Sequence, residues 1–360
     1  MINGKKVVVG MSGGVDSSVA AYLLKAAGYD VIGVTMQIWP READEDVSKK
    51  GGCCGLSAAE DAARVAQMIG IPHYVMNFRE EFREKVICYF MEEYLAGRTP
   101  NPCIACNRYV KWESLLHRSM QIGADFIATG HYARVERLSN GRYAIRRSVT
   151  AAKDQTYALY NLTQEQLAHT LMPVGAYDKP AIRAIAEKIG LTVAHKPDSQ
   201  EICFVPDGNY AGFIEKNSTC PVPPPGNFVT ADGQILGRHR GITHYTIGQR
   251  KGLNLSMGHP VFVTEIRPET NEVVIGDAED VFTDHLLCDQ LNYMSVPAFT
   301  DGMRVMAKIR YNHSGAPATV RLVGSDCAEV IFDEPVRAVT PGQAVVFYDG
   351  DFIAGGGTIR

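Results

Sequence analysis

The sequence predicts an α/β chain in which a doubly wound parallel sheet is followed by a small central domain and a C-terminal β-barrel. Strand-like and helix-like runs alternate through the first part of the chain, which is typical of a parallel sheet covered by helices. A proline-rich stretch, residues 221–226, cannot continue either structure, and short strand-like runs separated by turns follow it. We therefore expect three domains, at residues 1–205, 206–278 and 279–360.

The individual elements follow from local signals. Apolar residues on one face predict a first helix at residues 17–27, and the capping-box pattern at Ser57 predicts a second helix that stops at Gly70. Asn107 can cap a later helix, and Asn140-Gly141 between strand-like runs predicts a hairpin turn. We also expect strands at 6–11, 31–36, 73–77, 124–130, 261–266, 272–275, 304–309, 319–322, 328–332 and 344–348, and helices at 80–96, 108–122 and 180–189.

The composition limits the classes of protein to consider. The chain has 360 residues, of which 46% are hydrophobic and 21% charged, so it has enough apolar residues for a large core. No apolar run approaches the roughly 18 residues that a membrane-spanning helix needs, and the first strand begins almost at once, so we expect a cytoplasmic protein without a signal segment. The net charge of -4 means that a nucleic-acid partner would have to be held by local basic patches.

The most informative stretch is SGGVDSS, residues 12–18, between the first strand and the first helix. Its two glycines allow a tight turn that points several amides at one spot, and the serine hydroxyls and the helix N-terminus add further positive ends of dipoles. This arrangement can hold a phosphate chain, although it is not the Walker loop. Because the carboxyl ends of parallel strands meet at one edge, we expect the loop to converge with Met36 and residues 129–131.

Asp16 places a carboxylate inside this phosphate loop, where it would face an anionic ligand. Such a group is useful if Mg²⁺ bridges it to the phosphates, or if it orients the loop backbone. The sequence leaves both roles open.

The cysteines indicate a second site. Nine cysteines are an odd number, which favours metal binding or catalysis over a disulfide framework in a chain of this kind. An expected helix follows Cys103-Ile104-Ala105-Cys106, and its N-terminus would favour the Cys106 thiolate. This spacing permits a redox dithiol or structural zinc, but the only nearby pair, Cys53-Cys54, is adjacent rather than spaced. Taken alone, Cys203 would be a buried strand residue.

Over nearly its whole length the chain resembles the tRNA-specific 2-thiouridylases, which are ATP pyrophosphatases with a pyrophosphate loop (PP-loop). Several ligase families share the loop, whereas the other similar stretches, taken in their order, are more specific. The similar stretches are residues 10–18, 99–102 with Cys106-Asn107, 128–133, 153–157, 198–204 and 245–253.

The resemblance implies an ATP-dependent sulfur transfer to the wobble uridine of tRNA. The C2 oxygen is adenylated with release of pyrophosphate, because a carbonyl oxygen is a poor leaving group until it carries AMP. Cys203 would accept sulfur as a persulfide, and Cys106 would attack that persulfide or close a disulfide with Cys203, which then requires a thiol reductant. ATP, as its Mg²⁺ complex, would be bound by Gly10, Met11, Ser12, Gly13, Gly14, Val15, Asp16, Ser17, Met36 and Gly130.

The resemblance also implies contacts with tRNA, whose target base must leave the anticodon stack. Asn101, Pro102 and Cys103 occupy the positions that touch this base. The C-terminal barrel would contribute to tRNA binding. The implied tRNA contacts are His131, Lys153, Asp154, Gln155, Arg310, Tyr311 and Gln343. The further partner would be a sulfur donor, either a cysteine desulfurase or a relay carrier.

Cys103 departs from the pattern, because some members of the family carry an aspartate there. A cysteine cannot fill a proton-transfer or base-contact role in the same way. The substitution also creates a set of three thiols, Cys103, Cys106 and Cys203, that could hold a [4Fe–4S] cluster with one iron open to hydrosulfide. Persulfide and cluster mechanisms therefore both remain open.

Two other functions compete with thiolation. One is a small-molecule ligase of the ATP-pyrophosphatase type, which shares the loop but gives no reason for Cys106, Cys203 or the β-rich C-terminal part. The other is a non-catalytic RNA-binding protein with structural zinc, which predicts no ATP turnover.

Overall fold

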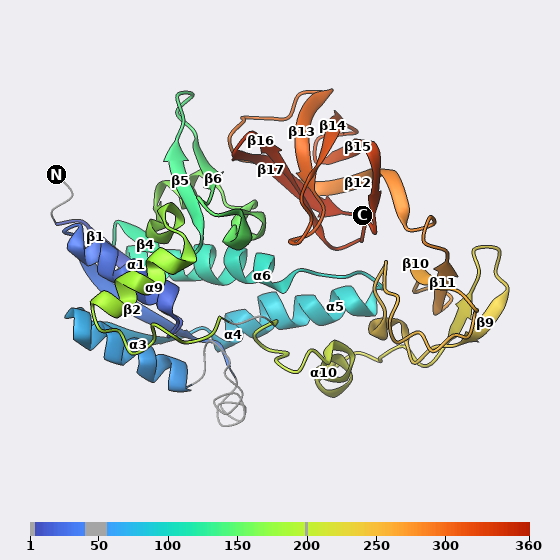
Figure 1. Cartoon of the computed structure of the whole chain (residues 1–360), viewed down its shortest axis with the longest axis horizontal. Coiled ribbons are helices and arrows are strands. Elements are labelled where there is room, and N and C mark those ends of the chain that lie inside the picture. The colour runs from blue at the N-terminus through green and yellow to red at the C-terminus, as the bar shows by residue number, and fades with distance from the viewer. Residues whose placement is uncertain (1–3, 40–55, 199–200) are drawn as a thin grey trace. The chain divides into compact units, whose positions relative to one another are not determined.

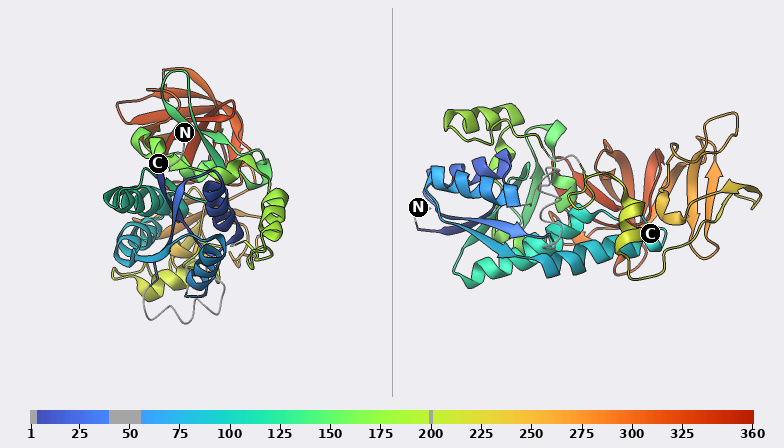
Figure 2. Two further views of the ribbon diagram at one scale, coloured as in Figure 1. Left: turned by 90° about the vertical axis from the view of Figure 1, so that its left-hand side faces the viewer. Right: turned by 90° about the horizontal axis from the view of Figure 1, so that it is seen from below.

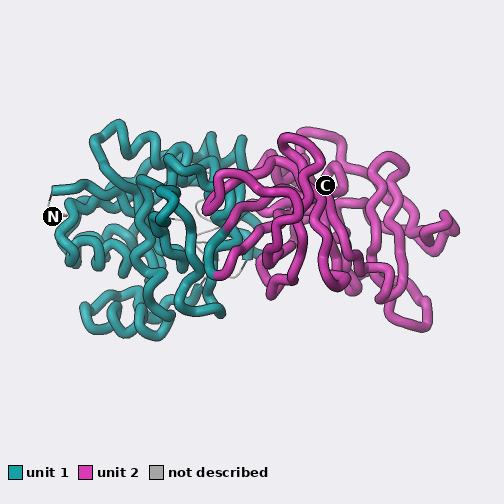
Figure 3. The backbone as a smooth tube through the Cα atoms, turned by 90° about the horizontal axis from the view of Figure 1, so that it is seen from above, with its two compact units in different colours: residues 1–86, 103–208, 351–353 teal, residues 87–102, 209–350, 354–360 magenta. Residues whose placement is uncertain are grey.

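The computed structural model describes residues 4–39, 56–198 and 201–360 (Figure 1). Its contacts divide the chain into two compact units, drawn in different colours in Figure 3. Unit 1 comprises Met1–Val86, Cys103–Gly208 and Asp351–Ile353, and unit 2 comprises Ile87–Pro102, Asn209–Gly350 and Ala354–Arg360. Among the described residues, no helix combines the length and the apolar character needed to cross a membrane.

Unit 1 contains the expected parallel sheet. Its five strands lie in the order β3-β2-β1-β4-β7, and each neighbouring pair is parallel. Because β1 lies between β2 and β4, the chain winds in both directions away from it, and ligands bind such sheets at the carboxyl end of that switch point. The strands are β1 (Lys6–Gly10), β2 (Asp30–Gln37), β3 (His73–Asn77), β4 (Phe126–Ala128) and β7 (Thr170–Leu171).

Helices cover both faces of this sheet, as the right-hand view of Figure 2 shows. One face packs against α1 (Val15–Ala26), α3 (Leu56–Ile69) and α9 (Lys179–Lys188), whose buried residues share a core with Val7, Val9 and Ala128. Ile182 and Ala186 of α9 are fully buried in that core. Apolar burial therefore docks α9 on α1.

A long helical stretch runs through α4 (Arg79–Phe82), the π-helix Arg83–Cys88 and α5 (Tyr89–Leu95), as the sequence predicts for residues 80–96. A second stretch comprises α6 (Pro102–Ala105), the π-helix Cys106–Leu115 and α7 (Leu116–Gln121). The second stretch begins earlier than expected. Pro102 takes the first helical position, where its missing N–H costs nothing.

Asn107 is therefore not a cap, because it lies inside the helix. Its side-chain amide donates to the carbonyl of Ala158 at 2.8 Å and its oxygen accepts from Lys111 at 2.9 Å. Elsewhere in unit 1 the Asn140-Gly141 hairpin is confirmed. It joins β5 (Ala133–Arg137) to β6 (Tyr143–Arg147), with Gly141 at a φ of 84°.

Unit 2 contains two β structures that follow α10 (Tyr210–Asn217). The first is a sheet in the order β10-β11-β8-β9. Its core gathers Phe228, Tyr245 and Val263. The strands are β8 (Asn227–Val229), β9 (Ile235–Arg238), β10 (Phe262–Arg267) and β11 (Glu272–Gly276).

The second β structure is the expected C-terminal barrel. Its strands lie in the order β12-β15-β14-β13-β16-β17, and pairing of β12 with β17 closes it around a core that includes Phe332 and Phe347. The strands are β12 (Phe282–Tyr293), β13 (Met303–Lys308), β14 (Ala316–Leu322), β15 (Cys327–Arg337), β16 (Ala344–Asp349) and β17 (Phe352–Ile359). The three-part fold class predicted from the sequence is thus confirmed.

Candidate active site

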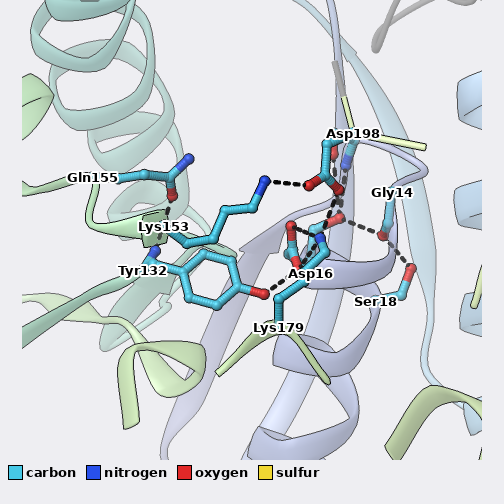
Figure 4. Close-up of polar contacts among 10 residues, drawn as sticks. Gly14, Asp16, Ser18, Tyr132, Lys153, Gln155, Lys179 and Asp198 are labelled. Atoms are coloured by element: carbon cyan, nitrogen blue, oxygen red, sulfur yellow. Dashed lines mark hydrogen bonds and ion pairs between the residues drawn. The ribbon is translucent and has the colours of Figure 1, made fainter. Parts of the chain in front are cut away.

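The loop after β1 has the geometry of an anion cradle (Figure 4). Gly13 adopts a φ of 69°, and a Cβ there would lie 2.4 Å from the carbonyl oxygen of Ala58, so only glycine fits. The hydroxyl of Ser17 accepts from the amide of Ser12 at 3.2 Å, and the hydroxyl of Ser18 donates to the carbonyl of Gly14 at 2.8 Å. These bonds turn the chain into the first turn of α1, whose unpaired amides face the loop.

Gly130 lets β4 reach this loop. A Cβ on Gly130 would lie 2.6 Å from the amide nitrogen of Ser17 and 2.7 Å from the carbonyl carbon of Asp16. The expected convergence of the loop with the residues after β4 is therefore observed. On the neighbouring strand β2, the hydroxyl of Thr35 donates to the carbonyl of Met11 at 2.9 Å, and half-buried Met36 follows it in the sequence.

Asp16 is one end of a network of four charged groups that runs through Lys179 and Asp198 to Lys153. The ammonium of Lys179 lies 2.8 Å from each oxygen of Asp16 and 2.6 Å from Oδ1 of Asp198. The ammonium of Lys153 donates to Oδ2 of Asp198 at 2.8 Å, and the hydroxyl of Tyr132 donates to Oδ1 of Asp16 at 2.6 Å. Two carboxylates and two ammonium groups thus share one site, and their formal charges cancel (Figure 4).

The network sets the protonation of its members. Burial alone would raise the pKa of Asp198, but the hydrogen bonds and charges of Lys153 and Lys179 outweigh it and hold that pKa below its ordinary value. Burial, together with the hydrogen bond to Asp16, raises the pKa of Tyr132 well above its ordinary value. Near neutral pH Asp198 is therefore charged, and Tyr132 keeps the proton that it donates to Asp16.

A third lysine supports the loop from the other side. The ammonium of Lys196 donates to the carbonyl of Gly13 at 3.1 Å and pairs with Asp61 on α3 at 2.8 Å. Holding that carbonyl on the lysine side fixes the orientation of the peptide bond between Gly13 and Gly14. Lys196 therefore helps to keep the following amide directed into the cradle.

The segment with Lys153, Asp154 and Gln155 is built into the same region. The side-chain oxygen of Gln155 accepts from the amide of Tyr132 at 2.9 Å. Asp154 is buried and accepts from the amides of Ser148 at 3.0 Å and Thr156 at 3.2 Å. Asp154 thus shapes its own turn, and Lys153 reaches the loop network. Their contacts with tRNA stay predictions.

His131, another implied tRNA contact, is packed within unit 1. Its ring lies 5.6 Å from that of Trp112, and Nδ1 lies 2.7 Å from the hydroxyl of Thr129. Burial and, to a lesser extent, the charge of Lys111 lower the pKa of His131 well below its ordinary value. The imidazole is neutral at pH 7, so it adds no positive charge for a phosphate backbone.

The proposed catalytic cysteines lie in two segments of unit 1. Cys103 is exposed in the first helical turn, and half-buried Cys106 follows one turn later. The expectation that Cys106 lies at the helix N-terminus is wrong, because the helix begins at Pro102 and the dipole effect fades beyond the first turn. Cys203 is half-buried in a turn rather than a strand, next to Phe204, whose ring packs edge-on against Phe82 at 5.8 Å.

The metal hypotheses have a geometric test. In the described parts of the chain, no three or more His, Cys, Asp or Glu side chains are grouped so that they could hold a metal ion. Cys103, Cys106 and Cys203 are all described, so they do not form a cluster-binding set in this structure. Cys53 and Cys54, the partners considered for zinc, lie outside the described residues.

The other implied tRNA contacts belong to unit 2. Arg310 and Tyr311 lie after β13, and the ring of Tyr311 is exposed. Gln343 precedes β16, and its side-chain amide donates to the carbonyls of Thr99 at 2.8 Å and Pro100 at 3.2 Å. Gln343 thus holds the backbone that leads into Asn101 and Pro102, the residues expected to touch the target base.

Sequence reasoning missed part of the charge network. The sequence around Lys179 does not indicate a binding role, because the predicted helix starts one residue later and a single lysine at a helix end is common. Lys196 likewise lies outside the stretches that resemble the family. Tyr132 and Asp198 lie inside stretches that carried the resemblance, so those stretches could have drawn attention to them.

Comparisons with known proteins agree with this geometry. Three family models cover the chain: the tRNA methyl transferase HUP domain matches residues 5–207, the tRNA methyl transferase PRC-barrel domain 213–277, and the aminomethyltransferase beta-barrel domain 283–359. A curated relative from Lachnoclostridium phytofermentans, named tRNA-specific 2-thiouridylase MnmA, is 68% identical over 99% of each chain. Relatives of the same name from Clostridioides difficile and Acetivibrio thermocellus are each 56% identical over at least 99% of both chains.

The family models carry methyltransferase descriptions, whereas the full-length relatives are named for thiolation. These relatives are 56–68% identical to the chain over at least 99% of its length. This chain belongs to the tRNA-specific 2-thiouridylase family.

Proposed function

We propose that this chain is a tRNA-uridine 2-sulfurtransferase that uses ATP to replace the C2 oxygen of the wobble uridine with sulfur. The observation that carries the proposal is the cradle between β1 and α1, with Asp16, Lys179 and Lys196 beside it. The chain that holds this cradle matches a thiouridylase over 99% of its length. Backbone amides at a helix N-terminus with lysines close by suit a polyphosphate better than a neutral ligand.

ATP would bind with its phosphates on the amides of the loop and the first turn of α1. Backbone amides and the helix dipole stabilise negative charge without the cost of reorganising solvent. Gly10 ends β1, Met11 and Ser12 lie in the loop, Val15 and Ser17 lie in the first turn of α1, and Met36 and Gly130 would border the nucleoside. The glycine positions support this assignment, because Cβ atoms at Gly13 and Gly130 would fill the space the backbone needs.

The residues present fit a magnesium ion brought in with the nucleotide. Mg²⁺ in such sites is held by one or two carboxylates together with phosphates and water, and Asp16 offers a carboxylate that is about a quarter exposed, at 27%. Asp16 would hold the ion, which would supply charge neutralisation at the phosphates. Lys179 and Tyr132 hold the carboxylate in place.

The first chemical step is attack of the uridine C2 oxygen on the α-phosphorus of ATP. A bond forms between O2 and phosphorus, the bond to the β-phosphate oxygen breaks, and pyrophosphate leaves. The product is an O2-adenylated uridine, in which AMP has become a good leaving group. Asn101, Pro102 and Cys103 would contact the base, and His131, Lys153, Asp154, Gln155, Arg310, Tyr311 and Gln343 would contact the tRNA.

In the second step the terminal sulfur of a Cys203 persulfide attacks C2, and AMP leaves. The Cys106 thiolate then attacks the inner sulfur, which breaks the persulfide bond and leaves sulfur on C2. Cys106 and Cys203 are joined as a disulfide, and two electrons from a thiol reductant restore both thiols. Alternatively, Cys106 attacks the persulfide first and the hydrosulfide released attacks C2. The donor that loads Cys203 would be a cysteine desulfurase or a relay carrier.

The cluster alternative receives no support from the described cysteines, which form no three-ligand set. Structural zinc within the described residues lacks support for the same reason.

The proposal can be tested with unmodified tRNA, ATP and a persulfide donor. Nucleoside mass analysis should show 2-thiouridine with the native protein, while Cys203→Ser should retain pyrophosphate release and lose thiolation. Cys220→Ser, which changes an exposed cysteine elsewhere, should behave like the native protein. Thiolation by Cys203→Ser would overturn the sulfur-transfer role, and pyrophosphate release that tRNA does not stimulate would favour a small-molecule ligase.

A further inference from the structure

Lys179 makes three contacts that together occupy its ammonium group. An ammonium has three N–H donors, and the structure places its nitrogen 2.8, 2.8 and 2.6 Å from two oxygens of Asp16 and one of Asp198. The side chain is only 12% exposed, whereas the two carboxylates are 27% and 25% exposed. The lysine therefore lies beneath the two acids, and the acids face the more accessible side.

Docking of α9 does not need these contacts. The helix is already held on α1 by Ile182 and Ala186, which are fully buried in the shared core. Asp178 caps the helix start by accepting from the amide of Ala181 at 2.8 Å. Ion pairs at partly exposed positions contribute little to folding in comparison with such packing. A purely structural role for Lys179 would thus be redundant.

The position of Asp16 creates an electrostatic problem that Lys179 solves. Asp16 lies in the first turn of α1, where the helix dipole favours a negative charge, and the same helix end forms the cradle for phosphate. A carboxylate there repels an incoming polyphosphate unless a cation offsets it. Among the contacts described for Asp16, Lys179 supplies the cation, and the hydroxyl of Tyr132 adds a neutral donor.

Asp198 has the opposite effect. Its Oδ1 accepts from Lys179 and its Oδ2 accepts from Lys153. The negative charge of Asp198 therefore offsets part of the positive charge that these two lysines present to the loop. Neutralising Asp198 while keeping its shape would leave the two ammonium groups facing Asp16 and the cradle. Removing the Lys179 charge would instead leave Asp16 and Asp198 with Lys153 alone.

We propose that Lys179 is a nucleotide-positioning residue: as the counter-ion of Asp16 it makes the cradle able to accept the triphosphate, and Asp198 limits how strongly it does so. The inference rests on the proposed function and adds a role for Lys179, which lies outside every motif. It predicts effects of opposite sign at two side chains that touch each other. A general weakening of the structure cannot produce that pattern.

The test is equilibrium binding of ATP to the full chain by calorimetry, without tRNA, once in EDTA and once with excess Mg²⁺. In EDTA, Lys179→Met should weaken ATP binding by about tenfold or more, because an uncompensated carboxylate remains at the cradle. Lys179→Arg should recover part of the affinity. Asp198→Asn should bind ATP several-fold more tightly than the native protein, and unchanged affinity would overturn the limiting role of Asp198.

Lys188→Met is the matched control, since Lys188 is an exposed lysine at the other end of α9. It removes the same charge from the same helix and should leave ATP affinity unchanged. Added Mg²⁺ should reduce the defect of Lys179→Met, because the ion can replace the lysine as partner of Asp16. Thermal unfolding of each variant would identify any loss of folding.

The outcomes separate this inference from the proposed function. If the native protein binds no ATP, the proposed function fails. If the native protein binds ATP and Lys179→Met binds it equally well in EDTA, the counter-ion role is overturned while the proposed function stands. Equal losses in Lys179→Met and Asp198→Asn would also overturn it, since they would indicate a network that only supports the fold.

Discussion

The two loops that lead into the helices α1 and α6 are built in opposite ways. The loop before α1 is rich in glycine and serine, and its backbone is held by serine hydroxyls and by Lys196 from a distant segment. The loop before α6, residues 97–101, is followed by Pro102 and contains Pro100, neither of which has an amide hydrogen. One loop therefore offers donors to an anion, and the other offers a fixed shape.

Unit 2 fixes the shape of the second loop. The amide of Thr99 donates to the carbonyl of Pro341 at 2.8 Å, and Gln343 covers the carbonyls of Thr99 and Pro100. A Cβ on Gly342 would come within 3.1 Å of the backbone of Thr99, so the two segments are closely packed. The difference is consistent with the roles proposed above, in which the first loop binds a nucleotide and the second contacts the target base.

The largest effect should follow from removing the carboxylate in the first loop. Asp16→Ala should abolish tRNA-stimulated pyrophosphate release, because it removes the carboxylate proposed to hold Mg²⁺ and leaves Lys179 without its partner in the loop. The assay is pyrophosphate release with tRNA at saturating ATP. Asp30→Ala, at an exposed position on β2, is the control, and activity retained by Asp16→Ala would contradict the loop assignment.

A second large effect should come from filling the space between the loop and β4. Gly130→Ala forces a Cβ to within 2.6 Å of the Ser17 amide, which must move the first turn of α1. We expect a loss of about 1–3 kcal/mol in the free energy of unfolding and clearly weaker ATP binding. Urea unfolding and calorimetry would measure both.

Gly324→Ala is the control for that change, because a Cβ at Gly324 would meet no atom within 4 Å. It should alter neither the stability nor ATP binding. Native ATP affinity in Gly130→Ala would mean that the first loop tolerates a shift of α1. That result would contradict the claim that ATP binding depends on the exact backbone geometry of the first loop.

A smaller and more selective effect is expected in the second loop. Gln343→Ala removes two hydrogen bonds to the Thr99–Pro100 backbone, together worth about 1–3 kcal/mol. Thiolation of tRNA should slow several-fold, while the KM for ATP stays unchanged because the first loop is untouched. Gln234→Ala, at an exposed position, serves as the control. A change confined to the KM for ATP would contradict the proposal that the second loop contacts the target base and not the nucleotide.

The smallest effect concerns pH. The pKa of Asp198 is held below its unfolded value of about 3.9, so its contribution to stability is complete above that pH and disappears as the pH falls through the folded pKa. Urea unfolding of the native protein and Asp198→Asn should therefore give a constant difference from about pH 5 to 8 and a shrinking one below about pH 4. A difference that varied between pH 5 and 8 would assign the titration to another group.

The parts of the molecule that depend on local sequence could be predicted. The first loop, the parallel sheet, the Asn140-Gly141 hairpin and most strands have signals within a few residues, and the structure contains them. The sequence does not predict β17, because its three consecutive glycines, Gly355 to Gly357, have a low intrinsic preference for strands. Its pairing with β12, for example Asn292 with Gly356, supplies what the local sequence lacks.

The charge network could not be predicted in this way. Lys153, Lys179 and Lys196 are far from the loop in sequence, and lysines at helix ends or in turns are common, so only the tertiary fold singles them out. The start of the helix before Cys106 was misplaced for a different reason. Asparagine is a common helix cap, so Asn107 indicates a helix start at residue 108, whereas the helix begins at Pro102.

The account depends most on the claim that ATP activates the C2 oxygen of the uridine. Its most direct test is a tRNA whose target uridine carries heavy oxygen at C2, incubated with the protein, ATP and a persulfide donor. The account predicts that the label appears in the phosphate of the released AMP, in step with the formation of 2-thiouridine. Label found in water or pyrophosphate, with AMP unlabelled, would contradict it.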